Sequence, residues 1–324
     1  MNPTRPCVAF LTFALLAAAA QAQGAVYPSK PVTLVVGSAP GGTTDIAARM
    51  LAEPLGKALG QTIVVDNRAG ASGAIAAVAV KRAEADGHTL LMQYSGYHVI
   101  TPVVSKQALG WEAKDLQPVA NVLSAPQVVV VRAGLPVKSM AELVAYAKAN
   151  PGKLTYASSG NGSLQHVTGA MLEQQAGIQM THVPYKGTGP ALQDLLGSQV
   201  DVTFGTPPPY MAHIQSGKLR ALAVTGRTRL ASLPDVPTAA EAGLPKLDAT
   251  SWFAVFAPAA TPKGVVDKLV AEIGRVMATP EFKKKAADLG ASADFVPPSK
   301  LGELTQAELK RWAEVAKASK IEAD

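Results

Sequence analysis

The stretch VTLVVGSAPGGTTD, residues 32–45, joins a β-branched apolar run to a helical pattern through a turn that contains two adjacent glycines. The run Val32–Val36 lies between a proline and a glycine, which predicts a buried strand. Apolar residues then recur at helical spacing over residues 44–59, which predicts an amphipathic helix. A strand, a tight turn and a helix in this order are the repeating unit of an α/β fold.

Over residues 32–92 this alternation predicts a parallel sheet with crossover helices. We expect further strands at residues 62–65, 88–92, 128–131, 154–157, 181–183, 200–204 and 219–224, and helices at 74–83, 164–175, 190–196 and 300–318. Three helix starts carry capping signals. Ser139 and Glu142 form a capping-box pattern, and Thr261 and Thr279 each precede a proline.

The turn after the first strand has the chemistry of an anion site. Gly41 and Gly42 allow a tight turn and a close approach of backbone to a ligand. The amides of Thr43, Thr44 and Asp45 follow at a helix N-terminus, where partial positive charge favours an anion. The preceding loop contributes the hydroxyl of Ser38. The alternative is an ordinary strand-to-helix turn in which Thr43 or Thr44 is the N-cap.

A second turn repeats this architecture. The sequence SSGNGS, residues 158–163, follows a predicted strand and precedes a predicted helix. Ligands of parallel α/β sheets bind beyond the carboxyl ends of the strands, so the two turns together favour a binding site. The candidate ligand-binding residues here are Ser158, Ser159, Asn161, Ser163 and His166. The alternative is a flexible loop in which Ser163 caps the helix, with His166 as a structural residue.

The first residues have the pattern of a secretory signal peptide. Arg5 precedes an apolar stretch over residues 8–20, and Ala20 and Ala22 are small residues suited to cleavage after Ala22. The stretch is too short to span roughly 30 Å of hydrocarbon. The one cysteine, Cys7, lies within this segment, so we expect a secreted chain that begins at Gln23 and forms no disulfide.

Composition and missing motifs exclude several functions. The net charge of +6 is spread along the chain and aromatic residues are 5%, which does not suit a nucleic-acid surface. The sequence has no Gly-x-Ser-x-Gly elbow, no phosphate-loop lysine motif and no Gly-x-Gly-x-x-Gly. Its five histidines show no metal-ligand spacing. We therefore expect neither an enzyme nor a bound metal or cofactor.

Several segments together resemble the extracytoplasmic receptor family of tripartite tricarboxylate transporters, also called the Bug family. The resemblance covers almost all of the chain after residue 26. It is carried, in order, by residues 27–32, 40–45, 64–71, 86–91, 158–163 with His166, 183–187, and 233–238 with 241–243.

The resemblance implies an α/β, two-lobed periplasmic-binding-protein fold of the Venus-flytrap, type II-like kind, with crossing strands between the lobes. Lobe 1 would comprise residues 26–124 plus 251–324, and lobe 2 residues 125–250. The family's first loop, here Gly41 to Thr44, would capture a carboxylate, and its second loop would close over the other end of the ligand. Ser95, Tyr185, Gly205 and Thr206 complete the expected contacts.

The expected function is capture of a small carboxylate in the periplasm by a monomer, for the membrane permease subunits of a tripartite transporter. Two alternatives stay open, namely presentation of a closed form to a sensor kinase, and binding of an acidic amino acid. Gly205 stands where relatives often carry an acidic residue or asparagine. Without a carboxylate there, a ligand's ammonium group lacks a partner, so we expect a simple organic acid.

Overall fold

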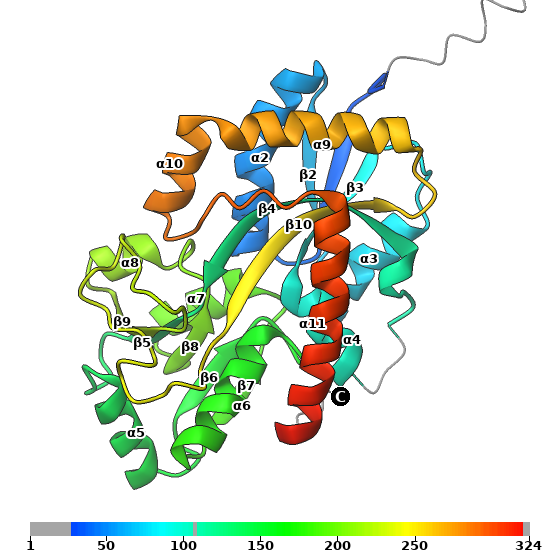
Figure 1. The fold of residues 1–324 in the computed structure, drawn as a ribbon. Coiled ribbons are helices and arrows are strands. Elements are labelled where there is room, and N and C mark those ends of the chain that lie inside the picture. The colour runs from blue at the N-terminus through cyan, green and yellow to red at the C-terminus, as the bar shows by residue number, and fades with distance from the viewer. Residues whose placement is uncertain (1–26, 106–108, 320–324) are drawn as a thin grey trace, which may run out of the picture.

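The structure is a computed structural model that describes residues 27–105 and 109–319 (Figure 1). The predicted signal peptide lies outside the described residues. The described chain forms two α/β units, each built on its own five-stranded sheet. In Figure 1 one unit lies in the upper half of the view and the other at the lower left.

The first sheet has the strand order β2-β1-β3-β10-β4. Its strands are β1 (Val32–Val36), β2 (Ile63–Asn67), β3 (Thr89–Tyr94), β4 (Leu116–Pro126) and β10 (Thr250–Pro258). The helices of this unit are α2 (Thr43–Leu59), α3 (Ala74–Lys81), α4 (Thr101–Val104), α9 (Lys263–Ala278) and α10 (Pro280–Asp288), with a π-helical turn η2 at Gly96–Ile100.

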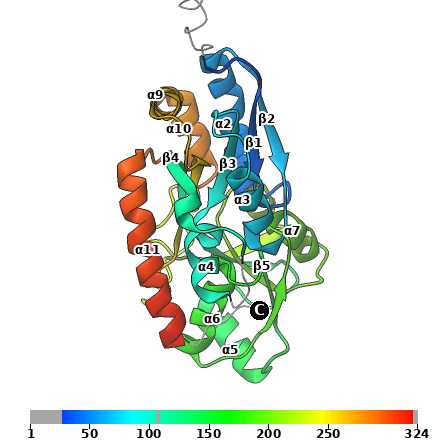
Figure 2. The same ribbon diagram turned by 90° about the vertical axis from the view of Figure 1, so that its right-hand side faces the viewer.

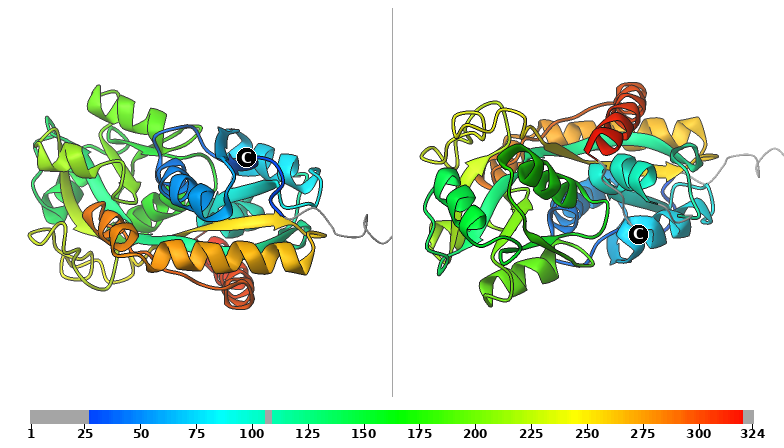
Figure 3. Two further views of the ribbon diagram at one scale, coloured as in Figure 1. Left: turned by 90° about the horizontal axis from the view of Figure 1, so that it is seen from above. Right: turned by 90° about the horizontal axis from the view of Figure 1, so that it is seen from below.

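The second sheet has the order β7-β6-β8-β5-β9. Its strands are β5 (Val128–Arg132), β6 (Thr155–Ser158), β7 (Thr181–Pro184), β8 (Val202–Gly205) and β9 (Leu219–Val224). The helices α5 (Met140–Ala149), α6 (Leu164–Ala176), α7 (Thr188–Leu196) and α8 (Met211–Gln215) surround it, as the views from above and below show (Figure 3). Separate buried apolar clusters lie on its two faces.

Both sheets are mixed, and the parallel pairing predicted for the strands of residues 32–92 is confirmed. The strands β1, β2 and β3 are parallel, as are β6, β7 and β8. The exceptions are β10, antiparallel to β3 and β4, and β5, antiparallel to β8 and β9. The reason is topological, because the chain leaves the first sheet along β4 and returns along β10 in the opposite direction.

The passage between the units is short and held by hydrogen bonds. Gln127 alone separates β4 from β5. Its backbone N–H donates to the carbonyl of Ala249 at 3.1 Å and to Thr225 Oγ1 at 2.9 Å, and the Thr225 N–H donates back to the Gln127 carbonyl at 2.8 Å. The long helix α11 (Pro298–Ser319) contacts β4 and also α6, so it runs beside both units (Figure 2). No helix of the described residues is long and apolar enough to cross a membrane.

The three predicted capping signals have different outcomes. Thr279 is the N-cap of α10, with its hydroxyl accepting from the Phe282 N–H at 3.3 Å. Ser139 caps α5, but the Glu142 carboxylate reaches back to the N–H of Lys138 rather than to that of Ser139, so the capping box is incomplete. The prediction for Thr261 is wrong, because Pro262 occupies the N-cap position of α9. The Thr261 hydroxyl is buried without a hydrogen-bond partner among the described residues.

This difference makes a matched pair of stability predictions. Thr279→Ala removes a side-chain cap and should lower the free energy of unfolding by about 1 kcal/mol. Thr261→Val replaces an unpaired buried hydroxyl with a methyl group and should leave stability unchanged or raise it. Urea unfolding of the two variants measures both effects. A loss of about 1 kcal/mol in Thr261→Val would show that its hydroxyl has a partner.

Candidate functional site

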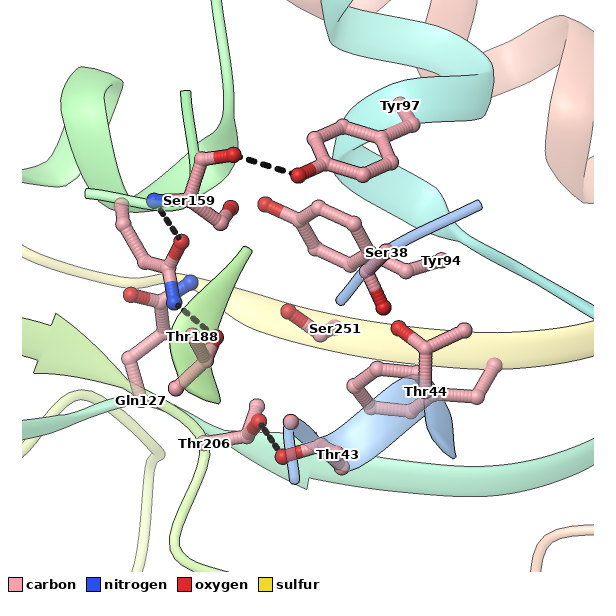
Figure 4. Close-up of a pocket in the computed structure, with 13 residues that line it drawn as sticks. Ser38, Thr43, Thr44, Tyr94, Tyr97, Gln127, Ser159, Thr188, Thr206 and Ser251 are labelled. Carbon is pink, nitrogen blue, oxygen red and sulfur yellow. Dashed lines mark hydrogen bonds between the residues drawn. The ribbon is translucent and has the colours of Figure 1, made fainter. Parts of the chain in front are cut away.

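A small cavity lies between the two units, where the turns after several strands meet (Figure 4). It is lined by Ser38, Gly42, Thr43, Thr44, Tyr94, Tyr97, Gln127, Ser159, Gln165, Thr188, Thr206, Ser251 and Phe253. The lining residues come from both units and from the passage between them.

Six of the predicted site residues line this cavity together. Ser38, Gly42, Thr43 and Thr44 come from the turn after β1 and the start of α2, whereas Ser159 and Thr206 follow β6 and β8. The two sets meet directly, because the hydroxyls of Thr43 and Thr206 lie 2.7 Å apart (Figure 4). The carboxyl ends of strands in both sheets therefore face one cavity, as expected for α/β sheets.

Gly41 and Asp45 stabilise the first turn instead of lining the cavity. One oxygen of the buried Asp45 carboxylate accepts from the Gly41 N–H at 3.1 Å, and both accept from Arg49 Nε at 3.0 Å. The Arg49 guanidinium also donates to Asn67 Oδ1 at 3.3 Å. The amide N–H of Asn67 donates in turn to the Ser38 carbonyl at 3.0 Å. The Asp45 carboxylate is thus committed to ordering the loop.

The remaining predicted residues of the second turn hold it in shape. Ser163 is the N-cap of α6, as the alternative interpretation predicted, and accepts from the His166 N–H. His166 Nδ1 accepts from the Gly162 N–H at 3.2 Å. Its ring stacks on that of His182 with the centroids 4.0 Å apart, and His182 Nε2 lies 2.6 Å from the Ser158 hydroxyl.

Four further predicted residues also lie outside the cavity lining. The Ser95 hydroxyl accepts from the Trp252 N–H at 3.3 Å, and the Tyr185 hydroxyl donates to Asp194 at 2.6 Å. Asn161 presents its backbone carbonyl to the other unit. At Gly205 there is no room for a side chain, because a Cβ atom would lie 2.4 Å from the ring of Tyr210.

The sequence did not point to the other lining residues, which are Tyr94, Tyr97, Gln127, Gln165, Thr188, Ser251 and Phe253. Tyr94 and Tyr97 could have been found, since they follow the predicted strand at 88–92 at its carboxyl end. Gln127, Ser251 and Phe253 belong to the crossing segments, whose strands the hydrophobic pattern did not reveal. Gln165 joins the second turn to α7, accepting from the Ser159 N–H at 2.7 Å and donating to Thr188 Oγ1 at 3.1 Å (Figure 4).

The cavity lining is polar but uncharged. It contains no carboxylate, ammonium, guanidinium or imidazole group. Burial raises the pKa of Tyr97 to about 12 and raises that of Tyr94 as well, so both phenols are neutral at physiological pH. Buried oxygens of Ser38, Gln127 and Ser251 have no hydrogen-bond partner among the described residues. These atoms are free to bind a ligand.

Two helices begin at the cavity without a side-chain cap. The N-cap of α2 is Gly42 and that of α7 is Gly187, and neither helix start is capped by a side chain. The first turn of a helix leaves N–H groups without intrahelical partners and carries partial positive charge. Thr43 and Thr188, the first residues of these helices, both line the cavity. Together these two helix starts form a positive environment made only of neutral groups.

A cluster of three or more potential metal ligands is absent from residues 27–105 and 109–319. The histidines that do lie together are a stacked pair held by backbone and hydroxyl groups, which suits a structural role.

Known proteins match the chain over most of its length. Residues 47–321 match the model of the tripartite tricarboxylate transporter family receptor. BugT of Bordetella pertussis is 35% identical over 98% of both chains. The structure of the periplasmic binding protein BugD superposes with a TM-score of 0.87 at 37% identity, covering 92% of this chain and 100% of the other.

Two related structures were determined with bound molecules. The R. palustris protein Rpa4515 with adipate has a TM-score of 0.89 at 36% identity, over 91% of this chain and 99% of the other. MatC from Rhodopseudomonas palustris with bound malate has a TM-score of 0.84 at 34% identity, over 89% and 99% of the two chains.

The fold and the cavity between the two units define a periplasmic binding protein, which confirms the predicted two-lobed fold. The chain belongs to the family of tripartite tricarboxylate transporter receptors, the Bug family, as its sequence resemblance predicted. Since this is a family of binding proteins, the prediction that the chain is not an enzyme is also confirmed.

The stacked histidines predict a pH dependence of stability. Burial, with a contribution from His166, lowers the pKa of His182 to about 3, whereas an unfolded histidine titrates near 6.5. Between these values the unfolded chain binds a proton that the folded chain does not, so the free energy of unfolding falls as pH falls. Burial also lowers the pKa of His98 to about 3, which makes the free energy of unfolding fall further as pH falls.

His182→Phe should therefore reduce, without abolishing, the loss of stability between about pH 7, above the unfolded pKa, and about pH 5, below it. Urea unfolding of the wild type and the variant at both pH values measures the difference. An equal loss in the two proteins would show that His182 has an ordinary pKa.

Proposed function

We propose that this protein captures a small organic acid in the periplasm and delivers it to the membrane permease of a tripartite transporter. The observation that carries the proposal is the uncharged cavity at the two uncapped helix starts of α2 and α7. Helix N-termini bind anions through free N–H groups and the helix dipole. A carboxylate at this place would accept hydrogen bonds from backbone N–H groups that no side chain of the protein caps.

The ligands of similar proteins support this choice. Adipate and malate, which accompany the two R. palustris proteins, are both dicarboxylates. In the proposed complex the carboxylate lies on the amides of Thr43 and Thr44, with hydroxyls of Ser38, Ser159 and Thr206 around it. Gly41, Asp45, Ser163 and His166 contribute by holding the two turns in shape.

The same arrangement argues against an amino acid as ligand. An ammonium group in the cavity would meet no carboxylate, because Asp45 is bound to Arg49 and to its own turn. The end of β8 cannot supply one either, since the Tyr210 ring fills the space beside Gly205. The proposed ligand is therefore anionic and carries no ammonium group.

Export and domain organisation complete the proposal. Residues 1–22 would be removed after Ala22, and the secreted monomer would begin at Gln23. Its lobes would be residues 26–124 plus 251–324 and residues 125–250. The two sheets support this division, since β4 ends at Pro126 and β10 begins at Thr250.

Calorimetry with ligand pairs that differ only in the amino group tests the choice of ligand. Succinate should bind at least about a hundredfold more tightly than aspartate, and adipate more tightly than 2-aminoadipate, because an unpaired buried charge costs several kcal/mol. A wider panel of mono-, di- and tricarboxylates identifies the preferred chain length. Tighter binding of the amino acids would refute the organic-acid assignment, and binding of no carboxylate at all would refute the proposed function.

A further inference from the structure

The turn Gly70–Gly73, between β2 and α3, has an unusual backbone. Its four residues have φ values of +133°, +46°, +46° and +83°. Ala71 and Ser72, the two central residues, are not glycine, and left-handed backbone is costly for residues with a Cβ atom. Such conformations persist only where the surrounding structure holds them, and they cluster at functional sites.

Close packing against Tyr97 holds this turn in place. A Cβ atom at Gly73 would lie 2.5 Å from the Tyr97 ring, and one at Gly70 would lie 2.7 Å from Ile75. Glycine at position 73 therefore lets the turn lie directly on Tyr97, and glycine at position 70 lets it lie on Ile75. The turn and the tyrosine form one surface of the first unit, which faces the second unit.

From this surface two hydroxyls reach across to the backbone of the second turn. Ser72 Oγ donates to the Asn161 carbonyl at 2.7 Å, and the Tyr97 hydroxyl donates to the Ser159 carbonyl. Neighbouring side chains of the same unit extend the contact. Thr101 Oγ1 donates to the Gly162 carbonyl at 3.3 Å, and the Tyr94 hydroxyl accepts from the Leu164 N–H at 2.6 Å.

The second turn is shaped to accept Ser72. At Gly160, which has a φ of +132°, a Cβ atom would lie 3.0 Å from Ser72 Oγ and 3.3 Å from the Tyr185 carbonyl. A side chain at this position would push against the serine. Ser72 is half-buried and does not line the cavity, whereas Tyr94 and Tyr97 do.

We infer that Ser72 is a positioning residue that holds the two units closed over the cavity without touching the ligand. The inference rests on the proposed function, in that a carboxylate occupies the cavity beneath this contact. Loss of the Ser72 hydroxyl removes one hydrogen bond from the closed state and none from the ligand. Ligand release then becomes faster by the same factor for every carboxylate, and the order of ligand preference stays the same.

Spin-label distance measurements test the closed state directly. The chain has no cysteine after Cys7, so labels at Lys57→Cys in α2 and Lys148→Cys in α5 report the separation of the two units. Ser72→Ala removes the hydroxyl and keeps the cost of a left-handed backbone at a residue with a Cβ atom. Ser72→Gly removes both the hydroxyl and this cost. Ala71→Gly is the matched control, because it removes the cost of left-handed backbone at the neighbouring residue and keeps the Ser72 hydroxyl. Each protein is measured alone and with saturating adipate, malate or succinate.

The ratio of closed to open protein should fall about three- to tenfold in both Ser72 variants, the effect of one neutral hydrogen bond. It should not fall in Ala71→Gly. An unchanged ratio in Ser72→Ala, or an equal fall in Ala71→Gly, overturns the inference. A wild-type protein that never shows the closed distance, alone or with any of the three acids, overturns it as well.

Stopped-flow release of adipate and malate gives a second readout. Ser72→Ala should raise both dissociation rates by one common factor, and unequal factors would mean that Ser72 contacts the ligand. If neither acid binds the wild type, the proposed function fails, while the distances in the ligand-free proteins still decide the role of Ser72.

Discussion

The start of α2 and the start of α7 meet at one cavity, and neither has a side-chain cap. Unpaired N–H groups at a buried helix end are costly unless a ligand or water satisfies them. In this protein the two helix starts come from different units, so a ligand that binds both also brings the units together. The direct contact between Thr43 and Thr206 lies at the same place. Binding is therefore expected to favour closure.

An uncharged cavity suits a protein that must both bind and release an anion. Removal of one partner from a buried ion pair leaves an unpaired charge behind, at a cost of about 3–5 kcal/mol. Helix dipoles and hydroxyl groups have no such cost, because water can take the place of the ligand. The charged groups near the cavity are used to order its loops instead, as the contacts from Asp45 through Arg49 and Asn67 to Ser38 show.

The fold followed from the sequence where hydrophobic patterns were local. The strand–turn–helix units around β1 and β6 were predicted, because β-branched runs and helical periodicity stand side by side in the chain. Strands β4 and β10 were not found by pattern, since they carry apolar residues without clear alternation and pair with residues distant in sequence. Gln127, Ser251 and Phe253 lie on or beside these strands and were missed with them. Asp45 and His166 have the right chemistry for a site, yet both order the protein's own turns, Asp45 through Gly41 and Arg49 and His166 through Gly162.

The central claim is that backbone N–H groups at the start of α2 hold the carboxylate. Gly42 has a φ of −85°, so a side chain there causes no backbone strain, but its Cβ atom would lie 3.3 Å from that of Thr188, between the two helix starts. Gly42→Val should therefore weaken carboxylate binding by at least about 2 kcal/mol in calorimetry, the value of a charge-assisted hydrogen bond, while the protein stays folded. Gly264→Val, where no atom lies within 4 Å, is the matched control and should bind normally. Unchanged affinity in a folded Gly42→Val protein would contradict this account.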